Sequence, residues 1–384
     1  MTILANIIAR VRLVKAFRLA DLAIKHTTIN GEVIRKFPTI HSVKFFDERT
    51  EFVFTVPNGL DPKNVRKQSY VFRQVFGRST ELRGDLKRFV LNVYQRSIPR
   101  EVTYDYDAIT SAIEGLALPI IAGKDVRGKY VAYDMAHYPH LLIAGETGAG
   151  KSTQLRAILT TLIRAKNPDD LRLVLADMKR SEFHLFRNIA HVDSISTDVD
   201  SLQSALKGVA KELTDRGDML DRHEVTHIHE LPGGVRRPDI IVCIDEVALL
   251  KREKDVMSII EDVSAIGRAL GVYLILSMQR PDADVLDGKL KNNLTVRMAF
   301  RHSSAINSRI TIDESGAEYI PIDRRGRMLL KVERLREIQA PFLDVDKARK
   351  LLDQFRTKSK PKEIMPAPAE HLPLFGQLGG DNDA

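Results

Sequence analysis

Hydrophobic positions form near-continuous runs in the second part of this chain of 384 residues. The runs are HLLIAG (140–145), LRLVLAD (171–177), DIIVCIDE (239–246) and VYLILSMQ (272–279). Strands that are buried on both faces of a parallel sheet have this pattern. Segments with helical spacing lie between the runs, at 152–166, 200–222 and 254–270. This alternation predicts an α/β sheet whose strands are connected by crossover helices.

The first hundred residues change pattern over shorter distances. HSVKFF, TEFVFTV and RFVLNVYQ are rich in β-branched and aromatic residues, as strands are. PNGLDP supplies turn residues, and NVRKQSYVFRQVFG has helical spacing. Residues 1–25 also predict a helix, but Lys15 and Arg18 fall on its apolar side. That helix could lie on a membrane surface, or pack on the rest of the protein or on a partner subunit.

These patterns divide the chain into four parts. We expect a basic helical segment at 1–35, a small α+β domain at 36–115 and the sheet domain at 116–350. The Pro- and Gly-rich residues 351–384 predict a disordered tail.

The distribution of charge along the chain indicates the class of binding partner. The formal net charge is +8, and the first hundred residues hold 19 Lys and Arg against 8 Asp and Glu. This basic excess favours a polyanion, either nucleic acid or an acidic membrane surface, over the alternative of a solvated basic face. The single cysteine, Cys243, excludes a disulfide framework within the chain and indicates a reducing compartment. We therefore expect a cytoplasmic protein, with peripheral contact at the inner face of the cell membrane as a further option.

A phosphate-binding motif follows the first of the apolar runs. Its residues are Gly145, Glu146, Thr147, Gly148, Ala149, Gly150, Lys151 and Ser152, followed by Thr153. The glycines let the backbone N–H groups surround phosphates, and the helix that follows offers its N-terminus. Lys151 would reach the β- and γ-phosphates, and Ser152 would bind Mg²⁺. The motif thus predicts ATP and Mg²⁺ as cofactors.

Two acids at the end of another buried run complete the predicted site. Asp245 would hold Mg²⁺ through a water molecule, and Glu246 would orient and polarise the attacking water. A kinase acting on a small substrate does not need an activated water. The adjacent glutamate therefore favours hydrolysis.

Further polar residues are candidates because they lie beside the predicted strands. Gln279 could sense the γ-phosphate or place the water, or it could simply cap a turn. Arg268 could stabilise phosphoryl charge across a subunit interface, or be an ordinary arginine near a helix end. Asp177 and Lys179 either support the site or form a strand-end ion pair.

Several blocks in register resemble the FtsK/SpoIIIE family of DNA translocases, over about residues 118–332. The blocks are HLLIAGETGAGKST, LADMK, IIVCIDEVALL, IGRALGVYLILSMQRPDADVLDGKLKNN, VRMAF, SSAINSRITIDESGAE and GRML. The resemblance implies a hexameric RecA-like motor that threads double-stranded DNA through a central pore and is driven by ATP hydrolysis. It implies the phosphate loop at 145–153, the Walker B pair at Asp245 and Glu246, and the QRP block at Gln279 and Arg280.

The resemblance also assigns basic residues. Arg268 falls where related type IV coupling ATPases place an arginine finger that acts on the neighbouring subunit, and we prefer it to Arg297 and Arg309. Lys291 and Arg297 match basic family positions that face either DNA or the neighbouring subunit.

The N-terminal region narrows the expected role. FTVPNGLDPKNV and ELRGDLKRFVLNVY look more like the FtsK-type proteins of Gram-positive conjugative elements and plasmids. This resemblance implies conjugative or plasmid DNA transfer or segregation, with a relaxase or membrane secretion proteins as partners.

Other functions are weighed against this one. An adaptor that binds DNA or a partner and uses ATP only as an assembly switch fits less well, because Lys151 and Glu246 are both intact. A transporter-type ATPase needs an LSGGQ-like signature, which LPGGV (231–235) lacks. Kinase activity is disfavoured because nothing resembles a substrate lid.

Overall fold

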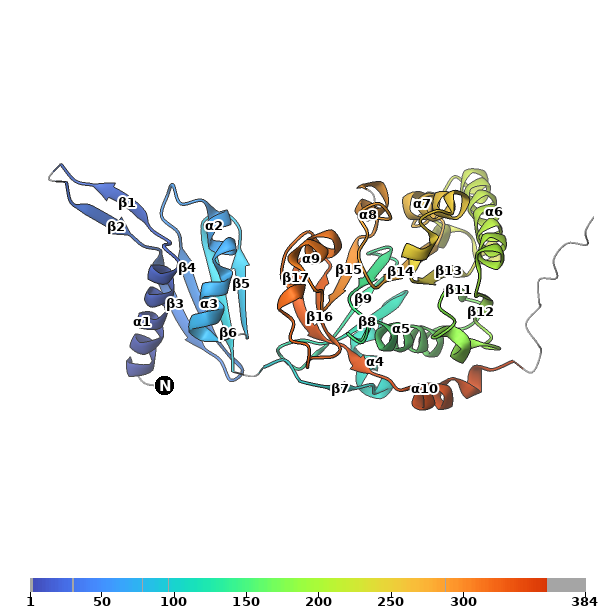
Figure 1. The fold of residues 1–384 in the computed structure, drawn as a ribbon, viewed down its shortest axis with the longest axis horizontal. Coiled ribbons are helices and arrows are strands. Elements are labelled where there is room, and N and C mark those ends of the chain that lie inside the picture. The colour runs from blue at the N-terminus through green and yellow to red at the C-terminus, as the bar shows by residue number, and fades with distance from the viewer. Residues whose placement is uncertain (1–2, 30, 78, 96, 287, 358–384) are drawn as a thin grey trace, which may run out of the picture.

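The structure is a computed structural model with two domains joined by a short connection (Figure 1). It describes residues 3–29, 31–77, 79–95, 97–286 and 288–357. The tail predicted to be disordered lies outside the described residues from position 358 onward. None of the helices in the described part of the chain is long and apolar enough to cross a bilayer.

The N-terminal domain is built on an antiparallel sheet with the order β3-β4-β6-β5. Its strands are β3 (Thr39–Phe45), β4 (Arg49–Thr55), β5 (Thr80–Gly84) and β6 (Arg88–Tyr94). Its helices are α1 (Ile3–Leu19), α2 (Pro62–Lys67) and α3 (Ser69–Phe76). A hairpin of β1 (Ile24–Thr27) and β2 (Val33–Lys36) projects away from the sheet (Figure 1). The hairpin and β5 are elements that the sequence pattern did not predict.

Helix α1 shares one hydrophobic core with this sheet. The buried Phe17 ring lies 4.9 Å from the ring of Phe54 in β4 and 6.2 Å from that of Phe72 in α3, measured between centroids. The opposite side of the helix exposes Ile3, Leu4, Ile7, Ile8 and Val11. The boundary predicted at residue 35 therefore does not separate two structural units.

The first helix ends at Leu19, earlier than the predicted end at residue 25. Asp21 adopts a left-handed backbone with φ 47°, and the Leu22 N–H donates to the Phe17 carbonyl at 3.0 Å. A hydrogen bond from an N–H group to the carbonyl five positions earlier is characteristic of the Schellman motif, which satisfies backbone carbonyls in the last turn of a helix. The chain then turns directly into the hairpin.

The larger domain is built on a ten-stranded sheet with the order β12-β11-β13-β14-β10-β15-β16-β17-β8-β9. Its strands are β8 (Pro119–Lys124), β9 (Tyr130–Asp134), β10 (Leu141–Ala144), β11 (Leu171–Asp177), β12 (Val192–Ser196), β13 (Asp239–Asp245), β14 (Val272–Met278), β15 (Val296–Phe300), β16 (Arg327–Lys331) and β17 (Leu335–Gln339). The strands from β12 to β15 in this order pair in parallel, and the remaining pairs are antiparallel. The predicted mainly parallel α/β sheet is confirmed, with an antiparallel extension on one side.

Helices cover both faces of the sheet. One face carries α4 (Tyr106–Ile113), α5 (Lys151–Ala165) and α10 (Val345–Leu352). The other carries α6 (Val199–His223), α7 (Lys254–Ile266) and α8 (Gly288–Asn293). A further helix, α9 (Ala305–Ile312), contacts β15. Three layers thus place both faces of the central strands in hydrophobic cores.

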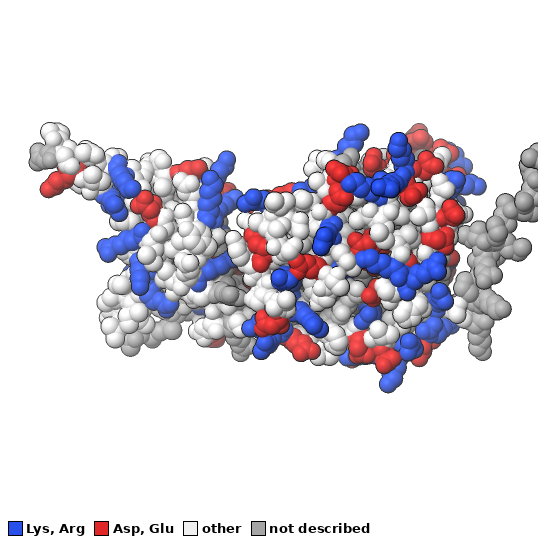
Figure 2. Space-filling model, viewed as in Figure 1, with Lys and Arg blue, Asp and Glu red and all other residues white. Residues whose placement is uncertain are grey.

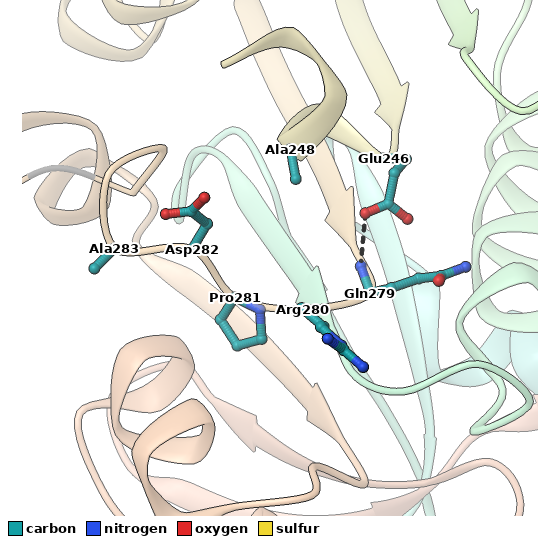
Figure 3. Close-up of a pocket in the computed structure, with 7 residues that line it drawn as sticks. All are labelled: Glu246, Ala248, Gln279, Arg280, Pro281, Asp282 and Ala283. Atoms are coloured by element: carbon teal, nitrogen blue, oxygen red, sulfur yellow. Dashed lines mark hydrogen bonds between the residues drawn. The ribbon is translucent and has the colours of Figure 1, made fainter. Parts of the chain in front are cut away.

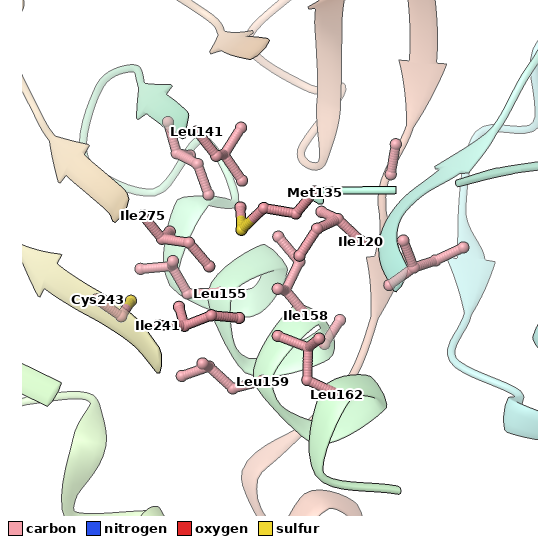
Figure 4. Close-up of a cluster of buried hydrophobic side chains, with 14 of the residues drawn as sticks. Ile120, Met135, Leu141, Leu155, Ile158, Leu159, Leu162, Ile241, Cys243 and Ile275 are labelled. Carbon is pink, nitrogen blue, oxygen red and sulfur yellow. The ribbon is translucent and has the colours of Figure 1, made fainter. Parts of the chain in front are cut away.

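This layering explains the apolar runs in the sequence. In β13, Ile241 and Cys243 pack with the α5 side chains (Figure 4), whereas Val242 and Ile244 pack toward α6 and α7. Burial of one such aliphatic side chain contributes about 1.5–3 kcal/mol, so polar residues are excluded from both faces. Polar residues reappear only where the strands end, and the candidate site lies there.

The larger domain begins earlier than the predicted residue 116. β7 (Val102–Thr103) pairs in parallel with β18 (Pro341–Phe342), and Tyr104 and Ile109 are fully buried in the core beneath α5. A short helical turn, Asp353–Phe355, also extends this domain past residue 350. The predicted boundaries missed both segments because many of their residues face solvent. The few buried residues in them are too far apart to form a continuous apolar run.

Candidate active site

The polar strand ends meet around one cavity of about 650 Å³. β14 lies between β10 and β13, so the loop after β10 and the acids at the end of β13 approach the cavity from two sides of β14. From the loop, the cavity is lined by Thr147, Gly148, Gly150, Lys151, Ser152 and Thr153. From the other strand ends it is lined by Lys179, Ser181, Glu182, Asp245, Glu246 and Gln279. The structure thus gathers most of the residues predicted for the site.

The loop between β10 and α5 requires glycine at two positions. Gly145 has φ 153°, and a Cβ there would lie 2.6 Å from the Cβ of Phe300. Gly150 has φ 120°, and a Cβ there would lie 2.9 Å from the backbone of Gly326. Ala149 adds to this contact, because its carbonyl accepts the Gly326 N–H at 2.8 Å. Packing against β15 and the loop before β16 therefore fixes the conformation of the phosphate loop.

Lys151 is folded back onto its own loop. Its Nζ donates to the Gly145 carbonyl, and to the Glu146 carbonyl at 3.0 Å. Burial lowers the pKa of Lys151 to about 8, although the carboxylates of Glu246 and Asp245 oppose the shift. The Glu146 side chain forms an ion pair with Arg301 and so stays outside the cavity. The structure therefore holds a desolvated ammonium beside the cavity, where a polyphosphate would stabilise its charge.

Asp245 lies among other carboxylates. Burial raises the pKa of Asp245, and the carboxylates of Glu182, Glu246 and Asp177 raise it further. No group of three or more metal-ligating side chains is arranged to hold a metal in the described residues. Mg²⁺ often binds through one or two protein groups together with substrate phosphates, so Ser152 and Asp245 suit an ion that arrives with a nucleotide.

Glu246 is held from two directions. It has a left-handed backbone with φ 63°, uncommon for a residue with a side chain, and it is buried. Its Oε1 accepts the backbone N–H of Gln279 at 3.1 Å (Figure 3), and its Oε2 accepts Lys179 Nζ at 2.7 Å. The carboxylate therefore has a defined position at the edge of the cavity.

Gln279 connects the two halves of the site. Its Oε1 accepts a hydrogen bond from the Thr147 hydroxyl at 3.1 Å, while its backbone N–H binds Glu246. Glu246 and Gln279 also line a second, open hollow with Ala248 and residues 280–283 (Figure 3). Gln279 is thus in contact with the phosphate loop and the predicted base, as a γ-phosphate sensor would need to be.

Asp177 and Lys179 do not form the strand-end ion pair that was one alternative. The Asp177 carboxylate accepts the backbone N–H groups of Ser181, Glu182 and Phe183 at 2.8–3.1 Å. It therefore shapes the loop that lines the cavity, while Lys179 pairs with Glu246.

The far wall of the cavity comes from segments that the sequence pattern did not connect with it. These are Arg100 and Glu101 from the domain connection, and Asp323, Arg325, Gly326, Gln339, Ala340, Pro341 and Phe342 from the chain around β16 and β18. Phe342 is half exposed there. No local signal could have found these residues, because the β7–β18 pairing that brings them together spans more than 200 positions.

Arg268 does not line the cavity of its own chain. It is exposed and precedes β14, at the opposite edge of the parallel strands, where His227 and Tyr273 are neighbouring groups. The arginine is therefore available to another molecule, and its predicted action on a neighbouring subunit stays a prediction.

Lys291 and Arg297 lie together in an ion cluster. Both pair with Asp313, Lys291 at 2.8 Å and Arg297 at 2.5 Å, and Lys331 joins them at 2.8 Å. Arg297 is also buried and donates to the Leu294 and Lys291 carbonyls. The predicted role of Arg297 in facing DNA or a neighbour does not fit this burial, which makes it a structural residue. Arg309 lies in α9, and its carbonyl accepts from Lys291.

The chain is similar to known proteins in sequence and in structure. Residues 114–237 match the FtsK/SpoIIIE family. The protein named DNA translocase FtsK from Borreliella burgdorferi is 35% identical over 212 residues, which are 52% of this chain and 27% of that protein. The chain spans less than a third of the length of the curated relatives that it matches first.

Solved structures extend the likeness to both domains. The pCW3 conjugation coupling protein TcpA, in a monomer form with ATPgS, has a TM-score of 0.60 at 24% identity and covers 88% of this chain and 97% of that chain. The cytoplasmic domain of the Type VII secretion ATPase EccC of Thermomonospora curvata has a TM-score of 0.58 at 24% identity, covering 66% and 32%. The chain thus shares its fold with this coupling protein and with this secretion ATPase, and its residues 114–237 are similar to the FtsK/SpoIIIE family.

Proposed function

We propose that this chain is an ATPase that drives DNA translocation, of the FtsK/SpoIIIE type. One observation carries the proposal: the phosphate loop, Asp245, Glu246 and Gln279 meet around a single cavity. A protein that binds a nucleotide as a switch, without hydrolysing it, needs only the phosphate loop. A buried glutamate held beside that loop is the additional group that hydrolysis requires.

The residues would divide the chemistry among them. Lys151 would leave the Gly145 and Glu146 carbonyls for the β- and γ-phosphates. Ser152 and Asp245 would hold the Mg²⁺ that neutralises phosphate charge. Glu246 would accept a proton from the water that attacks the terminal phosphorus. Because Gln279 touches Thr147 and Glu246, it would report the presence of the terminal phosphate to the strand end after β14.

The substrate is argued from the relatives, because the fold alone is shared with secretion ATPases. The sequence relatives at 34–36% identity are named as DNA translocases, and the structure that matches both domains is a conjugation coupling protein. We therefore assign double-stranded DNA in conjugative or plasmid transfer as the substrate, with a relaxase or membrane secretion proteins as partners. Contacts with DNA phosphates would supply the affinity without base reading.

The test is ATP turnover by the purified chain with no DNA, with duplex DNA and with single-stranded DNA of equal nucleotide content. We expect duplex DNA to stimulate turnover, and a matched concentration of heparin to control for a general polyanion effect. ATP-dependent displacement of a triplex-forming strand from the duplex would then show movement. An ATP turnover rate that is the same with and without duplex DNA would instead favour the ATP-switched adaptor.

We further propose a homohexamer in which Arg268 acts on the nucleotide of the adjacent subunit. Its exposure at the edge opposite its own cavity supports this proposal. Arg268→Ala should abolish turnover and leave nucleotide binding intact. Arg236→Ala is the matched control, because Arg236 is exposed and makes only a 3.6 Å contact with Asp170. Normal turnover by the Arg268 variant with DNA present would remove the assignment.

We place the protein in the cytoplasm, with the N-terminal domain at the inner face of the membrane as a proposed contact. Lys and Arg side chains are prominent on this domain in the view of Figure 2, and α1 exposes an apolar face beside four basic residues and no acidic ones. Basic and apolar groups together favour anionic lipid surfaces. Flotation with vesicles containing anionic lipid, compared with neutral vesicles, would test the contact.

A further inference from the structure

Both carboxylate oxygens of the predicted base accept hydrogen bonds from groups of the protein. Glu246 Oε1 accepts the Gln279 backbone N–H, and Oε2 accepts Lys179 Nζ at 2.7 Å. A carboxylate that activates water must direct an oxygen lone pair to that water and accept its proton. The Lys179 ammonium group at 2.7 Å occupies the carboxylate oxygen that would otherwise be free to accept from the water.

The two partners of this ion pair differ in freedom. Glu246 is buried, has a left-handed backbone and is fixed by the bond from Gln279. The Lys179 side chain is 33% exposed and lies in a turn after β11, on a flexible four-carbon stem. If the pair separates, Lys179 is therefore the partner that moves.

Lys179 also has another destination inside the same cavity. It lines the cavity with Lys151, and its charge contributes to lowering the pKa of Lys151 after the larger effect of burial. The positive charges of these two lysines repel each other, and an anion bound between them would reduce this repulsion. A bound polyphosphate would bring several negative charges to the space between them and compete with Glu246 for Lys179.

We propose that Lys179 is a positioning residue that restrains Glu246 through this ion pair and leaves it for the terminal phosphate of a bound nucleotide. This exchange links the activation of the base to occupancy of the site, so that Glu246 becomes competent only when a triphosphate is present. DNA would accelerate turnover by favouring the released state. The inference rests on the proposed ATPase function and concerns its regulation.

The experiment compares Lys179→Met with Lys179→Arg, each assayed for ATP turnover with and without duplex DNA. Methionine keeps the length of the stem and removes the charge, whereas arginine keeps the ion pair. We expect Lys179→Met to raise DNA-free turnover on the order of 10-fold and to reduce the stimulation by DNA, as expected when a coupling free energy is removed. Lys179→Arg should restore low DNA-free turnover. In the Glu246→Gln background, Lys179→Met should also bind ATP more weakly, because the phosphate loses a partner.

Lys251→Met is the control, because Lys251 pairs with Asp282 at 3.1 Å and with Asp284 at 2.5 Å without lining the nucleotide cavity. It should leave the ratio of turnover with and without DNA unchanged. DNA-free turnover of Lys179→Met that equals or falls below that of the wild type would overturn the restraint. If the wild type hydrolyses no ATP under any condition, the proposed function fails instead, so the two failures are distinguishable.

Discussion

Two acidic residues of the same domain, Asp245 and Asp313, have opposite electrostatic surroundings. Asp313 forms ion pairs with Lys291, Arg297 and Lys331. Burial would raise the pKa of Asp313, but these cations hold it well below the usual range. Burial raises the pKa of Asp245, and the carboxylates around it raise the pKa further.

The difference separates a structural cluster from a binding site. Around Asp313 the chain supplies the compensating cations itself, so the cluster joins α8, β15 and β16 without a ligand. Around Asp245 the compensation is incomplete, which is the expected state of a site that receives a cation with its substrate. Charge that the protein leaves uncompensated is thus better evidence for function than charge density alone.

The largest effect should come from Glu246→Gln. Removing the base should reduce ATP turnover by about 10²–10⁴-fold, while the protein still binds nucleotide and its free energy of unfolding changes little, because glutamine still accepts the Gln279 N–H. Steady-state turnover, titration with a fluorescent ATP analogue and urea unfolding would measure the three quantities. Substantial residual turnover would contradict the role of Glu246 as base.

Asp313→Asn should produce the reverse result, with stability lost and chemistry retained. We expect the free energy of unfolding to fall by about 1–2 kcal/mol, a value reduced for the partial exposure of Asp313. Because its pKa is lowered by folding, its contribution is fully present above the unfolded value of about 3.9 and is lost as pH falls through the folded value. Urea unfolding at pH 7, and at a pH well below the unfolded value of about 3.9, would follow this loss. A loss of turnover per folded molecule would show that the cluster has a further role.

Asp245→Asn should stabilise the nucleotide-free protein, by about 0.5–1 kcal/mol, while turnover falls. Folding raises the pKa of this carboxyl, so its charged form opposes folding, and that opposition grows as pH rises through the folded pKa. The gain should therefore be present at pH 7 and shrink in acid. Thermal unfolding with and without Mg²⁺ and ATP would measure it, with Asp313→Asn as the matched carboxyl-to-amide control. A destabilised variant at pH 7 would contradict the expected sign.

The smallest effect concerns the proton on Lys151. Its pKa of about 8 should rise when phosphates approach, so ATP binding at pH 8 should take up about half a proton. Calorimetry in two buffers with different ionisation enthalpies measures this uptake directly. At pH 6.5 this contribution should vanish, because the lysine is already charged.

Much of the central fold was predictable because burial on both faces leaves a strong pattern. Strands such as β13 and β14 were located from their apolar runs alone. The short antiparallel elements were harder to predict. The hairpin of β1 and β2 is mostly exposed, so no core selects its residues, and α4 shows only a few buried anchors in a polar segment.

The candidate site was predictable where its chemistry is local in sequence. The phosphate loop, Asp245 and Glu246 each follow a buried strand, and their convergence follows from the parallel order of those strands. The role of Lys179 was left open, since only the side-by-side pairing of β11 and β13 brings it to Glu246. The burial of Arg297 was not predicted either, because the sequence around a basic residue in a strand does not show whether the fold brings an acidic partner to it.

The anchoring of the domain connection has a mechanical consequence. The Arg327 guanidinium grips the Ile98 and Pro99 carbonyls, and the next residues, Arg100 and Glu101, form part of the cavity wall. The connection to the N-terminal domain is therefore anchored to the wall of the cavity. A change in the shape of the cavity would shift this anchor point, and so would transmit a displacement to the N-terminal domain.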